Sequence, residues 1–469
     1  MSRLLLPCIY FCAFFIAALA GWVGRTFGDP TVAQVVFHLY YADTAAFRMG
    51  EVYVVTFLTE AVALPLLLAA AATWLHRQAA RRWQGPRLRI LGAVPAVALA
   101  VGASLLLLQF SVFSFVAAHV GPDRFAAAYR APQQVQLQPG RLRNLVLVYV
   151  ESLETTYAAA ELFGSNLLAP LDELGGHRFA AYRQAPGATW TIAAMVATQC
   201  GVPLSIYSSE DMRAGGQRRA FLPGATCLGD VLQAHGYRNV FMGGAPLSFA
   251  GKGTFLRDHG YVERHGKEEW LAAGAVRRDF GGWGLHDDAL LARASARLAQ
   301  LQAAGQPFNL TLLTLDTHNP EGFTSATCSG QGVRNFADRV ACTSRLVADF
   351  VRTAGEQGLL ENTVVVILGD HLAVGNPVQR LLLEEPDRQL VNLFIGAEPP
   401  PGHRQELLPF DLFPSLLDAV GIEVAGGRLG LGVSGWVDPL PADLPQDLQN
   451  LHLPTLSASA AYLRLWRAP

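Results

Sequence analysis

Charged residues are scarce in this chain, and lysine is almost absent. Only 16% of the 469 residues are charged, the formal net charge is −2, and Lys252 and Lys267 are the only lysines. No basic run occurs after residue 120, so the composition gives no reason to expect a nucleic-acid partner. The hydrophobic content of 51%, by contrast, is high for a soluble protein. The composition therefore indicates a protein with a membrane-embedded part.

Cys-x-x-Cys pairs are also missing, so the six cysteines do not have the spacing of a zinc site. Two cysteines fall in the first apolar stretch, and the other four follow residue 120. An even number outside the apolar region is typical of disulfides in an oxidising compartment. Of the three possible pairings we expect the local one, which joins Cys200 to Cys227 and Cys328 to Cys342.

Long apolar stretches are confined to the first 120 residues. They cover residues 4–23, 52–75 and 90–116, and only Glu60 brings a charge into any of them. A helix of about 20 apolar residues crosses a bilayer, so we predict three transmembrane helices in a membrane domain at residues 1–120. We expect the first helix to remain uncleaved, although residues 17–20 resemble a signal-peptidase site.

The loops around these helices set the expected orientation. Five arginines follow the second stretch, between residues 77 and 89, and arginine is typical of cytoplasmic loops. The N-terminus is then inside, and everything after residue 120 is outside. In the outer loop, residues 31–41 have apolar side chains at helical spacing. That pattern is equally typical of an interfacial helix and of a plain amphipathic connector.

The remainder of the chain has the pattern of an α/β domain. Residues 121–143 are rich in proline, glutamine and arginine and are predicted to be a linker, with a catalytic domain at residues 144–469. Helical stretches, such as 287–302 and 336–357, alternate with apolar strand-like runs. Those runs cover residues 144–150, 238–242, 308–315, 363–368 and 390–395. Such alternation predicts a mostly parallel sheet between helices.

Three of these runs end in acids or histidines. Glu151 follows the first, Asp316, Thr317 and His318 follow the third, and Asp370 with His371 follows the fourth. In parallel sheets the carboxyl ends of the strands share one edge, where sites collect. A single acid at a strand end is usually a cap or turn former, but three such ends together predict a metal or phosphate site.

A nucleophile is predicted in the segment PGATWT at residues 186–191. A Pro-Gly turn opens there onto an apolar helix, and we place Thr189 at the N-cap, where free N–H groups and the helix dipole favour a phosphate. Threonine is also a common N-cap without any catalytic role. Because the acids and histidines are expected to lie nearby, we choose Thr189 as the nucleophile, with Thr191 as the second candidate.

Four segments together resemble a known family. They are residues 148–154 (VYVESLE), 189–204 (TWTIAAMVATQCGVPL), 315–318 (LDTH) and 369–372 (GDHL). The chain resembles the phosphoglycerol transferases that modify osmoregulated periplasmic glucans, relatives of lipoteichoic acid synthase in the alkaline phosphatase and sulfatase superfamily. None of the cysteines lies in the Cys/Ser-x-Pro-x-Arg context of sulfatases, so sulfate-ester hydrolysis is not expected.

The resemblance implies a site, residue by residue. One divalent ion, Mn²⁺ or Mg²⁺ with Zn²⁺ as an alternative, is expected on oxygen and nitrogen ligands. The expected ligands are Glu151, Thr189, Asp370 and His371. Thr189 is then the nucleophile, His318 contacts the substrate phosphate, and Trp283 and Asp287 lie near the head-group pocket.

The resemblance also implies partners. Phosphatidylglycerol is the expected donor, a glucan or another glycan is the acceptor, and the protein is a multi-pass inner-membrane protein with a periplasmic catalytic domain. Some glucan-modifying relatives are longer than this chain, which leaves the acceptor open. Two other enzymatic functions also stay open: a phosphoethanolamine transferase, and a metal-dependent phosphodiesterase or phosphatase in which Asp316 and His318 bind a second ion. A membrane sensor without activity is a further alternative.

Overall fold

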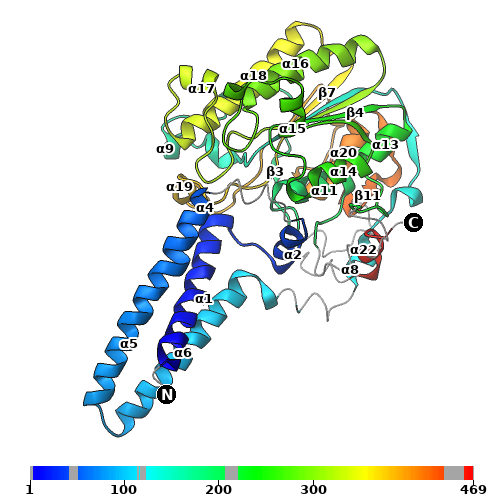
Figure 1. Ribbon diagram of the computed structural model, residues 1–469. Coiled ribbons are helices and arrows are strands. Elements are labelled where there is room, and N and C mark those ends of the chain that lie inside the picture. Colours follow the sequence, from blue (N-terminus) through cyan, green and yellow to red (C-terminus); the bar gives the residue numbers. More distant parts are fainter. Residues whose placement is uncertain are drawn as a thin grey trace.

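Figure 1 shows a globular domain from which three long N-terminal helices project together. This is a computed structural model, and it describes residues 4–41, 51–113, 116, 123–205, 220–437 and 459–467. The N-terminus lies at the far end of the helices, and the described C-terminal residues pack on the globular domain.

Three helices are long and apolar enough to cross a membrane, which confirms that prediction. The first is α1, Leu5–Phe27, and the third is α6, Pro86–Gln109. The second is continuous through three elements: α4, Glu51–Thr56; η1, Phe57–Ala63; and α5, Leu64–Arg82. Most of their residues are not buried in the structure, as expected for helices that contact lipid.

The one charge expected inside an apolar stretch has a partner. Glu60 lies in the π-helical segment η1 and forms an ion pair with Arg25 in the last turn of α1. The first helix was predicted to end at residue 23, so Arg25 was not expected within it. Because an unpaired charge is costly within lipid, the ion pair accounts for Glu60 as an interhelical contact.

The apolar residues at helical spacing in residues 31–41 do form a helix. Helix α2, Val32–Tyr40, begins after Thr31, whose hydroxyl accepts a hydrogen bond from Gln34 N–H at 3.2 Å. Its buried residues are Ala33 and Phe37, and Phe37 belongs to the core of the globular domain. The helix is therefore docked on that domain rather than being a free connector.

The segment predicted to be a linker also packs against the globular domain. Helix α8, Arg124–Ala128, buries Phe125 completely. Farther along, strand β1, Leu137–Pro139, pairs antiparallel with β10, Ile422–Val424. The segment expected to be a linker thus contains a short helix with a buried aromatic side chain and an edge strand, which its polar composition did not indicate.

The main sheet has six strands in the order β5-β4-β6-β2-β7-β8. Their bounds are β2, Asn144–Val150; β4, Arg238–Gly243; β5, Tyr261–His265; β6, Phe308–Leu313; β7, Thr363–Gly369; and β8, Asn392–Ile395. All pairings are parallel except that of β8 with β7. The mostly parallel α/β sheet is confirmed, and β5 is a strand that the sequence analysis missed.

Helices cover both faces of this sheet (Figure 1). Alternate residues of β2 enter two different cores: Leu145, Leu147 and Tyr149 one, and Val146, Val148 and Val150 the other. The first core contains α11, Thr191–Cys200; α13, Leu228–Ala234; and α20, Leu412–Ala419. The second contains α16, Asp287–Ala304, and α18, Phe336–Glu356. A central strand buried on both faces explains the unbroken apolar run in the sequence.

Shorter elements connect these layers. The short strands are β3, Ala181–Tyr182; β9, Glu406–Leu407; β11, Arg428–Leu429; and β12, Gly432–Val433. The short helices include α9, Ala160–Phe163; α10, Ala169–Asp172; α14, Lys252–Asp258; α15, Lys267–Ala272; α17, Ala326–Gly330; α19, Gln379–Leu382; and α22, Ala460–Arg464. Both predicted disulfides, Cys200–Cys227 and Cys328–Cys342, are present.

Candidate active site

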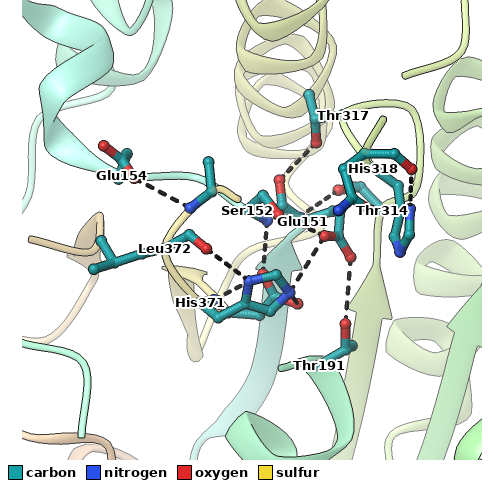
Figure 2. Close-up of polar contacts among 12 residues, drawn as sticks. Glu151, Ser152, Glu154, Thr191, Thr314, Thr317, His318, His371 and Leu372 are labelled. Carbon is teal, nitrogen blue, oxygen red and sulfur yellow. Dashed lines mark hydrogen bonds and ion pairs between the residues drawn. The ribbon is translucent and has the colours of Figure 1, made fainter. Parts of the chain in front are cut away.

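Glu151, Asp370 and His371 meet at the carboxyl edge of the sheet. Figure 2 shows Glu151 and His371 facing each other there. The register pairs Val150 of β2 with Gly369 of β7, so the residues that follow the two strands lie side by side. One ligand atom from each of the three side chains lies within 4.8 Å of the others. All three residues are buried, with 3%, 1% and 7% of their surface exposed, respectively.

Local backbone geometry holds this cluster in place. Ser152 has a positive φ of 54°, and its N–H donates to Asp370 Oδ1 at 2.7 Å. Its hydroxyl donates to Glu151 Oε1 at 2.7 Å. A Cβ at Gly369 would lie 1.8 Å from the carbonyl oxygen of Leu153, so only glycine lets the two strand ends approach this closely.

A hydrogen bond sets the orientation of the His371 ring. Its Nδ1 lies 3.0 Å from the carbonyl oxygen of Leu372, and because a carbonyl only accepts, Nδ1 carries a proton. Nε2 then faces the acids, 3.4 Å from Glu151 Oε1 and 3.6 Å from Asp370 Oδ2. The nitrogen that faces the acids is therefore the one able to bind a cation.

The charges in this cluster are strongly coupled. Burial together with the charge of Glu151 raises the pKa of Asp370 to about 7. Burial alone would raise the pKa of Glu151, but His318 and His371 lower it to about 2. Burial alone would lower the pKa of His371, but the carboxylates of Asp370 and Glu151 raise it to about 10. Near neutral pH the metal-free cluster therefore holds a proton on His371 and part of one on Asp370.

The cluster fits a divalent cation. Asp370 Oδ2 is buried and, within the described ranges, lacks a hydrogen-bond partner, although buried polar atoms normally have one. Two carboxylates and one imidazole are suitable ligands for Mn²⁺, Mg²⁺ or Zn²⁺. A cation among them would complete the coordination of Asp370 Oδ2 and replace the proton on His371.

A second acid-histidine cluster does not fit a cation. Cys227, Asp230 and His259 also lie close together. The thiol of Cys227 is consumed in a disulfide, and both His259 nitrogens are hydrogen-bonded, to Asp230 at 2.8 Å and to the Phe221 carbonyl at 3.0 Å. This cluster is part of the structural framework.

Of the two candidate threonines, Thr191 is the one whose hydroxyl contacts the cluster. Thr191 Oγ1 donates to Glu151 Oε2 at 3.4 Å, and Figure 2 shows its side chain pointing at that carboxylate from the start of α11. The N-cap of α11 is Trp190, so the placement of Thr189 at the N-cap is wrong by one residue. Thr189 itself is half-buried in the turn before Trp190.

His318 lies beside the cluster. Its Nδ1 donates to the carbonyl oxygen of Asn319 at 2.7 Å, which leaves Nε2 without a proton in the neutral ring. Burial lowers the pKa of His318, so the neutral ring is favoured. Trp283 packs edge-on against His318 with 4.0 Å between ring centroids, and its indole N–H is buried without a partner in the described part of the chain.

Asp287 and Asp316 lie behind the site as structural groups. Asp287 is completely buried and accepts hydrogen bonds from Leu315 N–H at 2.6 Å and from the Thr343 hydroxyl at 3.0 Å. Asp316 accepts hydrogen bonds from His286 at 2.8 Å and from Asp287 N–H at 3.1 Å. With these oxygens occupied, the geometry does not support substrate contact for Asp287 or a second ion on Asp316.

Sequence reasoning missed Lys252 as a site residue. It is 4% exposed, and among the described residues none forms a hydrogen bond or ion pair with its ammonium group. Burial lowers its pKa to about 8, although the negative charges of Glu151, Asp370 and Glu268 oppose that shift. The only feature of the sequence that could have drawn notice to Lys252 is that lysine is rare in this chain.

Comparison with known proteins gives a family and several relatives. A model of the Sulfatase family matches residues 143–422. A protein of Xanthomonas axonopodis pv. citri named phosphoglycerol transferase I is 34% identical over 399 residues, which are 82% of this chain and 55% of that relative. The chain thus spans about half the length of the curated relatives that it matches.

Solved structures are less similar to this chain in sequence than the curated relative is. An alkaline phosphatase superfamily protein from Vibrio parahaemolyticus has a TM-score of 0.48 and 21% identity, covering 70% of this chain and 78% of its own. A lipoteichoic acid synthase from Listeria monocytogenes has a TM-score of 0.49 and 18% identity, covering 64% of this chain and 78% of its own.

Proposed function

Because this chain belongs to the sulfatase family but has no cysteine in the sulfatase nucleophile context, we propose that it catalyses a different reaction on the same framework. That reaction is the transfer of phosphoglycerol from phosphatidylglycerol to a periplasmic glucan through a phosphoglyceryl-threonine intermediate. The similarity to phosphoglycerol transferase I supports this choice of head group. The three apolar helices support a lipid donor at the inner membrane, with the catalytic domain in the periplasm.

One contact carries the proposal: a threonine hydroxyl meets a buried carboxylate of a cluster suited to a cation. Thr191 donates to Glu151, which itself adjoins Asp370 and His371. For this reason we propose Thr191 as the nucleophile and Thr189, the choice from sequence, as its competitor. A divalent ion bound by Glu151, Asp370, His371 and the threonine would lower the pKa of the hydroxyl and neutralise charge on phosphate oxygens, worth about several kcal/mol.

The protein groups then have separate roles. The threonine oxygen forms a bond to phosphorus while the bond from phosphorus to the diacylglycerol oxygen breaks. His318 Nε2 accepts the threonine proton, since that nitrogen carries none in the neutral ring, and returns it to the departing diacylglycerol oxygen. In the second step a sugar hydroxyl attacks the same phosphorus, and the threonine hydroxyl is regenerated.

Intact-mass analysis tests this proposal. The full chain in nanodiscs of phosphatidylglycerol, supplied with Mn²⁺, is expected to gain a phosphoglycerol adduct that maps to peptide 189–200. Steady release of glycerol phosphate without an adduct would contradict transfer and favour a hydrolase. An adduct that forms only in phosphatidylethanolamine nanodiscs would reassign the head group to phosphoethanolamine.

Lys252 is proposed to hold the donor phosphate as a cation. A hydrogen bond between charged groups contributes about 1.5–3 kcal/mol, so Lys252→Met is expected to lower kcat/KM by about 10- to 100-fold. The same substitution is expected to raise the thermal midpoint, because it removes a buried ammonium whose pKa burial lowers to about 8. Transfer assays and calorimetry on the full chain measure the two effects.

The chain offers one matched control, since Lys267 is the only other lysine. Lys267→Met is expected to leave kcat/KM within about twofold, in line with a surface substitution. Full activity in Lys252→Met would remove Lys252 from the site.

A further inference from the structure

The outer ends of two membrane helices contact the residue that follows His318. The Asn319 side-chain N–H donates to the carbonyl oxygen of Thr26, near the end of α1, at 3.1 Å. From α4, the Tyr53 hydroxyl lies 3.2 Å from the Asn319 carbonyl oxygen and 3.1 Å from its side-chain oxygen. Helices α1 and α4, which lie far from His318 in the sequence, thus both form hydrogen bonds with Asn319.

The carbonyl oxygen of Asn319 links these helices to the site. It accepts from His318 Nδ1 at 2.7 Å and from the Tyr53 hydroxyl at 3.2 Å. A carbonyl oxygen has two lone pairs, so it accepts both donors at once. The hydrogen bond from Tyr53 therefore restrains the group that sets the tautomer and direction of the His318 ring.

The loop that follows His371 also packs against the end of α1. A Cβ at Gly375 would lie 2.6 Å from the Thr26 carbonyl oxygen, and its φ is +60°. Val374 contacts Gly28 at the end of the same helix, where an added Cβ would lie 3.1 Å from its side chain. Both loops that leave the site edge therefore pack against the outer end of α1.

We propose that Tyr53 is a positioning residue, which acts on His318 through Asn319 and makes the membrane segment part of the catalytic framework. The proposal rests on the proposed function only for the chemical role of His318. The positioning itself rests on the contacts that meet at Asn319, where the single Tyr53 O–H lies within hydrogen-bond distance of two oxygens and His318 Nδ1 donates to one of them.

The test uses the full chain in phosphatidylglycerol nanodiscs and the substitution Tyr53→Phe. Loss of a hydrogen bond of this kind corresponds to about a 3- to 10-fold effect. We expect kcat to fall by that factor while KM for the lipid stays within about twofold, and amide hydrogen exchange in peptide 316–322 to become faster by a similar factor. The amides of His318 and Gly322 report on this loop, because they donate to Leu315 and His318 carbonyls at 3.0 and 2.8 Å.

Thr56→Val is the matched control. Thr56 lies one turn beyond Tyr53. Its hydroxyl accepts a hydrogen bond from Trp22 at 3.1 Å and donates to the Tyr53 carbonyl oxygen at 3.2 Å, and neither contact involves the Tyr53 hydroxyl or Asn319. This variant is expected to change neither kcat nor exchange in the loop. If it accelerates exchange as much as Tyr53→Phe does, general loosening of the helices explains the result and the proposal is overturned.

The remaining outcomes separate this proposal from the proposed function. Unchanged exchange in Tyr53→Phe overturns the positioning role, and so does a rise in KM with constant kcat, which would mean direct contact with lipid. Faster exchange in Tyr53→Phe, combined with a wild-type chain that transfers no phosphoglycerol, supports the positioning role and overturns the proposed function instead.

Discussion

Thr191→Ala is expected to lower phosphoglycerol transfer by at least about 10³-fold, or about 4 kcal/mol of transition-state stabilisation, and to abolish the covalent adduct. The substitution removes the hydroxyl that contacts Glu151. It is expected to leave the fold intact, because Thr191 is the first residue within α11 and not its N-cap, and alanine favours helix. Transfer rate and intact mass of the full chain are the measurements.

Thr189→Ala is the matched comparison, two residues away. If Thr191 is the nucleophile, Thr189→Ala keeps the adduct and loses at most about tenfold in rate, a loss typical of a group that only supports the site. Thr191→Ser, which retains a hydroxyl, is expected to keep the adduct as well. An adduct that survives Thr191→Ala and disappears in Thr189→Ala would return the nucleophile to the residue chosen from sequence.

Asp370→Asn is expected to weaken divalent-metal binding by about 100-fold or more. Loss of a group that merely supports a ligand already costs 10- to 100-fold, and Asp370 is proposed to bind the ion directly. The asparagine oxygen can keep the Oδ1 hydrogen bonds from Ser152 and His371 N–H, at 2.7 and 2.9 Å, while its NH₂ group replaces the ligand oxygen. Thermal midpoints with and without Mn²⁺ measure the effect, since bound ligand stabilises the native state.

The metal-free variant is expected to be at least as stable as the wild type. At neutral pH the wild type carries Asp370 beside ionised Glu151, with its pKa raised to about 7, and asparagine removes that repulsion. Asp418→Asn is the control: burial raises the pKa of Asp418 to about 6, yet it lies outside the cluster. A Mn²⁺-induced shift in midpoint that persists in Asp370→Asn would argue against this metal site.

Proton release gives this site a defined pH dependence. Because His371 and part of Asp370 hold protons in the metal-free cluster, binding of a cation must displace them. The apparent metal affinity is therefore expected to rise as the pH increases from 6 to 8.

The sheet and the candidate metal cluster could be predicted from sequence because β2 and β7 are buried on both faces. Such strands are uninterrupted apolar runs, and the first polar residue after each run marks the edge of the sheet. Glu151, Asp370 and His371 occupy those positions, so the runs predicted that these three residues lie together. Strand β5 was missed because four of its five residues are not fully buried and its sequence, YVERH, lacks an apolar run.

Other parts of the site depend on contacts between distant segments. The turn before α11 decides whether Thr189 or Thr191 faces Glu151, and a shift of one residue rotates a side chain by about 100° around a helix. Lys252 is buried on a seven-residue helix, and Tyr53 contacts Asn319, next to His318, from a long apolar helix; neither helix carries a recognisable motif. The helical spacing of apolar residues in 31–41 does not show which side of α2 is buried, so Phe37 was not identified as an anchor.

The topology of the central sheet also bears on how the protein is made. Ser152 N–H and the Asp370 carboxylate, which hydrogen-bond across the site, are 218 positions apart in the chain. During synthesis the N-terminal part emerges first, so the apolar helices and Glu151 are made long before β7 and the two residues that follow it. A partly synthesised chain therefore has Glu151 and Thr191 but no Asp370 or His371. Assembly of the cluster is thereby postponed until most of the globular domain has been made, and an unfinished chain cannot form the candidate metal site.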